Sequence, residues 1–157
     1  MKLKFKPNYI IIPLITILVA AIGNLITSMG MSWYNSLNFP AFVPSGSFIG
    51  LVWTIIFILT TISALRFYNK FDNSPNFTVI SLLFFNNAFL NIFWSSLFFG
   101  AHQMGAALIE ILVLNIVNLA LIILLWKKHL ISALLLLPYF IWVCVATYLN
   151  YSLWIIN

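Results

Sequence analysis

Short polar segments divide the chain into five long apolar ones. Each apolar segment has roughly 20 residues, the length that a helix needs to cross the hydrocarbon core of a bilayer. None alternates strictly between apolar and polar positions, as the strands of about 10 residues in a membrane β-barrel do. We therefore predict an all-α fold, one five-transmembrane-helix bundle over residues 1–157. The expected spans are residues 8–29, 48–68, 77–99, 106–126 and 131–154.

The longest connection between spans, residues 30–47, is uncharged and rich in aromatic side chains. It contains Trp33, Tyr34, Phe39 and Phe42. Loops of this length that keep aromatic residues tend to pack back onto the protein. We expect this segment to form a lid over one end of the bundle.

The composition agrees with a membrane protein and excludes several other classes. The chain is 64% apolar and only 6% charged, whereas a soluble domain has about 25% charged residues. Nine charged residues cannot keep a soluble monomer of this size in water. The basic pI reflects seven Lys and Arg in an almost uncharged chain, without a basic patch for phosphates, so we expect no nucleic-acid partner.

The positions of the basic residues predict the orientation in the membrane. With five spans, all seven basic residues fall on the same side: Lys2, Lys4, Lys6, Arg66, Lys70, Lys127 and Lys128. Basic residues are enriched in cytoplasmic segments of membrane proteins. The pattern predicts a multi-pass protein of the cell membrane, with its N-terminus in the cytoplasm and the lid and C-terminus outside.

Polar and tryptophan side chains inside the spans recur at helical spacing. One face of the third span carries Asn87, Asn91, Trp94 and Phe98, and one face of the fifth carries Trp142, Ala146 and Asn150. Two interpretations are open. The amides either hydrogen-bond between helices or, with the indoles, line a cavity for a flat apolar ligand.

Three further residues are candidates for chemistry. Glu110 is the only carboxylate in a span, and a carboxylate inside a membrane is by default a candidate for a functional role. The alternative is that Glu110 is a hydrogen-bonded residue near the membrane interface. His102, in the turn after the third span, is either an axial ligand to a metal tetrapyrrole or an ordinary loop residue. Cys144 is the only cysteine, and we expect no metal site. No hydrolytic or phosphoryl-transfer arrangement of residues is present.

Four separated motifs resemble the TspO/translocator-protein family. They are Trp33-Tyr34-Asn35-Ser36-Leu37-Asn38-Phe39-Pro40, then Pro44; Trp53; Leu90-Asn91, Trp94 and Phe98 to Gly105; and Pro138-Tyr139, Trp142, Ala146-Thr147, Leu149-Asn150-Tyr151 and Trp154. The motifs occur in the family's order and spacing from about residue 33 to the C-terminus. The family fold is a five-helix bundle.

The resemblance implies a binding protein or sensor for tetrapyrroles such as protoporphyrin IX, which also takes ligands of benzodiazepine receptors. No cofactor is required, and the porphyrin is ligand or substrate. The implied partners are the lipid bilayer and a second copy in a homodimer. The candidate binding residues are Trp33, Tyr34, Trp53, Asn87, Asn91, Trp94, Phe98, Trp142, Ala146 and Leu149.

Two alternatives remain open at this point. Some bacterial relatives degrade protoporphyrin IX in light and oxygen, and the resemblance then makes Trp53 and Trp142 the catalytic residues. The other alternative is a transporter of porphyrins or other amphiphiles. Five helices cannot form two equal inverted repeats, which argues mildly against coupled transport.

Overall fold

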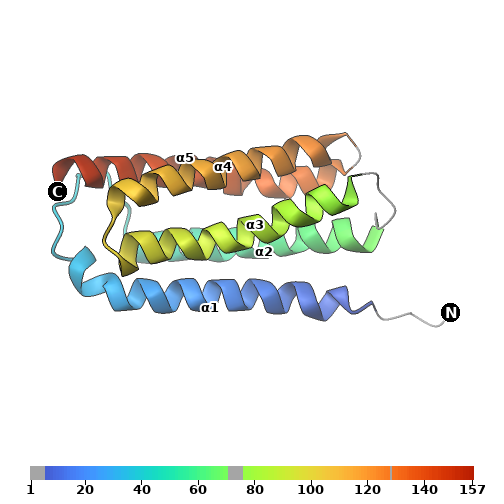
Figure 1. Cartoon of the computed structure of the whole chain (residues 1–157), viewed down its shortest axis with the longest axis horizontal. Coiled ribbons are helices and arrows are strands. Elements are labelled where there is room, and N and C mark those ends of the chain that lie inside the picture. The colour runs from blue at the N-terminus through green and yellow to red at the C-terminus, as the bar shows by residue number, and fades with distance from the viewer. Residues whose placement is uncertain (1–5, 71–75, 128) are drawn as a thin grey trace.

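The computed structural model describes residues 6–70, 76–127 and 129–157, which form an antiparallel bundle of five long helices (Figure 1). All five described helices are long and apolar enough to cross a membrane, with α3 and the π-helical turn η1 counted as one span. The predicted all-α five-helix fold is therefore confirmed. The elements are α1 (Asn8–Tyr34), α2 (Gly46–Lys70), α3 (Phe77–Ser95), η1 (Ser96–Gly100), α4 (Met104–Trp126) and α5 (Leu130–Ile156).

Hydrogen bonds between polar side chains and neighbouring helices connect the whole bundle. They link α1 to α2, α2 to α5, α3 to α4, α3 to α5 and α5 to α4. The five donor–acceptor pairs are Thr61–Thr16, Ser63–Ser132 carbonyl, Asn87–Asn118, Asn91–Tyr139 and Asn150–Met104 carbonyl. Because lipid offers no partner for such groups, the pairs made by Ser63 and by the asparagine amides are satisfied only when their two helices are correctly packed.

Helix α1 is the most peripheral of the five. It buries only Val19 and Gly30, whereas α4 and α5 each bury eight residues. It packs on α2, α3 and η1. Most of its apolar side chains therefore face the lipid.

The described basic residues gather at one end of the bundle. Lys6 precedes α1 and donates from Nζ to the carbonyl oxygen of Asn69, at 2.6 Å. Arg66 and Lys70 lie in the last turns of α2, and Lys127 follows α4. This agrees with the segregation predicted from the sequence; Lys2, Lys4 and Lys128 lie outside the described residues.

The first connection differs from the prediction. Helix α1 continues through Gly30 to Tyr34, so the segment predicted as a lid at residues 30–47 is a loop only over residues 35–45. Trp33 and Tyr34 are therefore on the last turn of a helix. Gly30 does not end the helix because it is a contact point: a Cβ there would lie 2.8 Å from the Cβ of Phe99.

The end of α3 widens into η1, which the sequence did not indicate. The N–H of Ala101 donates to the carbonyl of Ser96 at 2.8 Å, closing the wide turn. His102 follows with a φ of 57°, a backbone conformation that is uncommon outside glycine. Single π turns within helices occur frequently at functional sites.

We predict opposite outcomes for two helical glycines. Alanine at Gly30 would overlap Phe99, whereas a Cβ at Gly50 meets nothing within 4 Å. Overpacking costs about 1–3 kcal/mol, and alanine itself favours a helix by about 1 kcal/mol. Gly30→Ala should lower the thermal midpoint of the detergent-solubilised protein, and Gly50→Ala should leave it unchanged or raise it. Equal midpoints for the two variants would contradict the proposed contact.

Candidate functional site

Three of the candidate tryptophans converge between the helices in an inner cluster. Trp53 comes from α2, Trp94 from α3 and Trp142 from α5, and Ala146 lies one turn after Trp142. These side chains pack against a buried apolar group. That group consists of Ile56, Ile111, Leu114, Tyr139 and Val143.

Tyr139 is the buried residue that connects the aromatic and polar parts of the inner cluster. It is only 2% exposed. The rings of Trp53 and Tyr139 make an edge-to-face contact, with their centroids 5.9 Å apart. Its hydroxyl accepts a hydrogen bond from the Asn91 amide. Tyr139 is not among the binding residues predicted from the sequence. The feature of the sequence that could have identified it is its position on the same face of α5 as Trp142 and Ala146.

The amides predicted at this site make hydrogen bonds between helices. The Nδ2 of Asn87 donates to Asn118 Oδ1 at 2.6 Å. The indole N–H of Trp94 donates to Asn150 Oδ1 at 3.1 Å, and Asn150 donates onward to the carbonyl of Met104 at 2.8 Å. The interpretation as interhelical hydrogen bonds therefore accounts for these amides, and the same bonds orient the Trp94 ring.

Trp142 differs from Trp94 in its polar group. Its indole nitrogen is buried and has no hydrogen-bond acceptor among the described residues. Its ring meets the edge of Phe48, with centroids 6.2 Å apart. A buried donor without an acceptor costs about 1–3 kcal/mol. An acceptor atom on a bound molecule would satisfy it.

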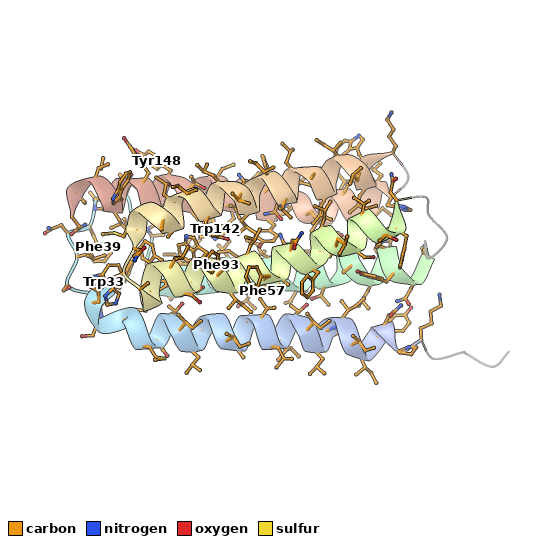
Figure 2. All side chains as sticks on the ribbon, viewed as in Figure 1. Trp33, Phe39, Phe57, Phe93, Trp142 and Tyr148 are labelled. Carbon is orange, nitrogen blue, oxygen red and sulfur yellow. The ribbon has the colours of Figure 1, made fainter. Side chains whose placement is uncertain are left out.

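An outer cluster covers the inner one at the end of the bundle where loop 35–45 lies. Trp33 and Tyr34 pack there against the buried side chains of Phe98, Ala107 and Leu153. Trp94 belongs to both clusters and stacks on Phe98 with centroids 5.1 Å apart. Figure 2 shows Trp142 deeper in the bundle than Trp33. Of the remaining candidates, Leu149 is partly buried on α5 and belongs to neither cluster.

Loop 35–45 is fastened to the end of α5. The backbone N–H of Asn38 donates to Asn157 Oδ1 at 2.8 Å, and Asn157 Nδ2 donates to the carbonyl of Asn38 at 3.1 Å. Phe42 stacks on Tyr148 of α5 at 5.3 Å. The expectation that this segment packs back on the protein is met, although its anchor residue Asn157 was not foreseen.

The two remaining candidates for chemistry are Glu110 on α4 and His102 after η1. Glu110 is 5% exposed, and neither carboxyl oxygen has a hydrogen-bond partner among the described residues. The exposed His102 stacks on Trp33 with ring centroids 4.2 Å apart and planes within 13°. Within the described ranges, no three His, Cys, Asp or Glu side chains are grouped to hold a metal ion. Cys144 accepts a hydrogen bond from Asn115 at 3.0 Å.

We predict that Asn157→Ala loosens loop 35–45. The change removes three hydrogen bonds to Asn38, and each such bond contributes about 0.5–1.5 kcal/mol. Amide hydrogen exchange in the loop should accelerate about tenfold, because opening becomes easier. Asn76→Ala, an exposed asparagine at the start of α3, should leave that exchange unchanged. Unaltered exchange in Asn157→Ala would show that the aromatic contacts alone hold the loop.

Comparison with known proteins identifies the family of this bundle. The pattern of the TspO/MBR family matches residues 10–155. Over 152 residues, 97% of this chain and 98% of the relative, the sequence is 30% identical to the tryptophan-rich protein TspO of Bacillus cereus. It is 32% identical to the protein CrtK of Rhodobacter capsulatus, over 80% of this chain and 79% of CrtK. It is 29% identical to the human translocator protein, over 80% and 75% of the two chains. The chain is thus a multi-pass integral membrane protein that belongs to the TspO/MBR family.

Proposed function

We propose that this protein binds a tetrapyrrole such as protoporphyrin IX among α2, α3 and α5, at the inner cluster. The observation that carries the proposal is the convergence of Trp53, Trp94 and Trp142 beside the small side chain of Ala146. A porphyrin is flat, apolar and aromatic on both faces. Indole rings offer it stacking surfaces, and a few fixed polar groups orient it.

The polar groups of the site also suit such a ligand. The indole N–H of Trp142, for which no described residue supplies an acceptor, is a donor for an acceptor on the ligand, such as a propionate oxygen or the carbonyl of a benzodiazepine-type compound. By contrast, the amides of Asn91 and Asn150 are already engaged. In this proposal Trp142 therefore orients the ligand, and the amides of Asn91 and Asn150 fix the helices that line the site.

Entry of a ligand involves loop 35–45 in this proposal. The loop is fastened through Asn38 and Asn157, and Tyr34 beneath it meets Phe39 with ring centroids 4.9 Å apart. Only a few hydrogen bonds and ring contacts have to open for it to move. Loops with few buried contacts are the parts of a protein that open most easily.

We further infer that the loop lies on the outer side of the cell membrane. The described basic residues occupy the opposite end of the bundle, and basic ends of membrane proteins stay in the cytoplasm. In the Cys144→Ser background, a cysteine at Ser36 should react in intact cells with a maleimide that cannot cross membranes. Reaction only after permeabilisation would reverse the orientation.

A second candidate function is the light- and oxygen-dependent degradation of the bound porphyrin. The specific observation is that Trp53 and Trp142, from different helices, belong to the same inner cluster. Indole is electron-rich, and a photoexcited porphyrin with oxygen as the final oxidant is able to oxidise it. Two indoles against one macrocycle would place the oxidised side chain beside its target.

We predict saturable binding in the dark. Protoporphyrin IX added to the detergent-purified protein should quench tryptophan fluorescence to a plateau at about one porphyrin per chain. Ala146→Phe should weaken binding at least tenfold, because the larger ring would crowd the inner cluster one turn after Trp142. The matched control is Val145→Phe, since Val145 is 39% exposed on the lipid side of α5. Quenching without saturation, or equal effects of the two variants, would remove the assignment.

Illumination separates the two candidate functions. Loss of the porphyrin absorbance bands faster than with free porphyrin, abolished in both Trp53→Phe and Trp142→Phe, would establish degradation. Trp126→Phe serves as the control, because Trp126 is exposed at the far end of α4. Saturable binding without protein-dependent bleaching would establish a binding protein or sensor.

A further inference from the structure

A polar contact centred on Asn69 joins the start of α1 to the end of α2. The carbonyl oxygen of Asn69 accepts a hydrogen bond from Lys6 Nζ at 2.6 Å, and its Oδ1 accepts one from Asn8 Nδ2 at 3.2 Å. Its own amide donor, Nδ2, is buried and has no acceptor among the described residues. Both acceptor atoms of Asn69 are therefore engaged, and the polar atom that remains is a donor.

The charged side chains around this contact are all cationic. Arg66 and Lys70 are four positions apart, on one face of the last turns of α2, and Asn69 lies beside them. Arg66 is partly buried and Lys70 is exposed, and neither forms a hydrogen bond or an ion pair with a described residue. The ammonium of Lys6 has three N–H groups, one of which is used. The contact therefore presents several donors and an excess of positive charge.

The acidic side chains of the chain do not balance this charge. There are two of them, Asp72 and Glu110. Glu110 lies on α4, 16 residues before Trp126 at the basic end, so roughly 24 Å away along the helix at 1.5 Å per residue. Asp72 lies outside the described residues. One carboxylate at most is thus available to offset three cations, and the contact keeps a net positive charge.

We propose that this contact binds the phosphate of an anionic phospholipid, with Lys6 supplying a cation from α1 and Arg66 and Lys70 supplying two from α2. A phosphodiester presents acceptor oxygens and one negative charge, which complements a group of donors with excess positive charge. The planar guanidinium of Arg66 suits two phosphate oxygens at once, and the ammonium groups act as point charges. Basic pockets between membrane helices bind lipid headgroups in this way.

The surroundings of the contact favour a lipid over a free phosphate ion. Helix α1 is the most peripheral helix, and its first turns expose apolar side chains directly after Lys6. Ile10 and Leu14, four and eight positions further on, are 58% and 52% exposed. A lipid whose headgroup is held at Lys6 would lay its acyl chains along this apolar surface. A phosphate ion has no such chains and gains nothing from it.

A basic end also has a simpler explanation, in which no lipid is bound. Basic residues collect on the cytoplasmic side of membrane proteins, and cations stabilise the C-terminal ends of helices. This explanation treats every cation at the basic end alike. Lys127 separates the two explanations, because it is exposed after α4, which packs mainly on α3 and α5. The proposal requires Arg66 to contribute more to lipid binding than Lys127 does.

Native mass spectrometry of the full-length protein in a neutral detergent tests the binding. Phosphatidylglycerol and phosphatidylcholine with the same acyl chains are offered in equal amounts, and the wild type should preferentially retain one phosphatidylglycerol per chain. Arg66→Gln should weaken this binding by about fivefold or more, the contribution of one cation beside anionic lipid, and Arg66→Lys should keep most of it. Lys127→Gln should weaken it by less than about twofold. Equal retention of the two lipids, or equal losses in Arg66→Gln and Lys127→Gln, would overturn the proposal.

Inorganic phosphate distinguishes a lipid site from a site for a free anion. Added in large excess, it should leave the phosphatidylglycerol bound, and displacement would rule out the lipid as the preferred occupant. Thermal midpoints in nanodiscs give a second readout. The wild type should be more stable in phosphatidylglycerol than in phosphatidylcholine, and Lys6→Gln should reduce that difference. Because Lys6 is exposed and precedes α1, this change is compatible with the fold. A wild type with the same midpoint in both lipids would contradict the proposal.

Discussion

The lack of water in the bilayer is the constraint on which this structure depends. Inside the hydrocarbon core, a side-chain amide or hydroxyl is satisfied only by another part of the protein. The bundle meets this requirement with bonds that each join two different helices, such as Ser63 to the Ser132 carbonyl and Asn150 to the Met104 carbonyl. Apolar packing alone discriminates weakly between arrangements in lipid, because lipid tails are as apolar as leucine. The polar pairs therefore set which helices are neighbours.

The same hydrogen bonds between helices also position the aromatic side chains of the candidate site. Trp94 donates to Asn150, and Asn91 donates to Tyr139, whose ring in turn meets Trp53. The indoles are thus held in place by groups whose first role is to join α3 to α5. Trp142 is the exception, since its N–H is not engaged by any described residue. A site built in this way combines walls held by hydrogen bonds with an indole N–H for which the described residues offer no acceptor.

The sequence was sufficient for the features that depend on period and length. It predicted the five spans, the single basic end, and the stripes that bring Trp94 and Trp142 inward. It could not reveal contacts made by groups without a pattern. Gly30 reads as a helix end but is the point where α1 meets Phe99. The widened turn after Ser95 has no composition signal. The bond between Asn38 and Asn157 joins two ordinary polar residues far apart in the chain.

That last bond has a consequence for the order in which the protein is made. Asn38 and Asn157 are 119 positions apart, and Asn157 follows the last helix. Loop 35–45 emerges from the ribosome before α2, yet its anchor arrives only after α5. The loop therefore cannot be fastened until every helix has entered the bilayer. During synthesis, Trp142 of α5 completes the tryptophan cluster before Asn157 is available to fasten loop 35–45. The final step of assembly is therefore also the step that closes the site.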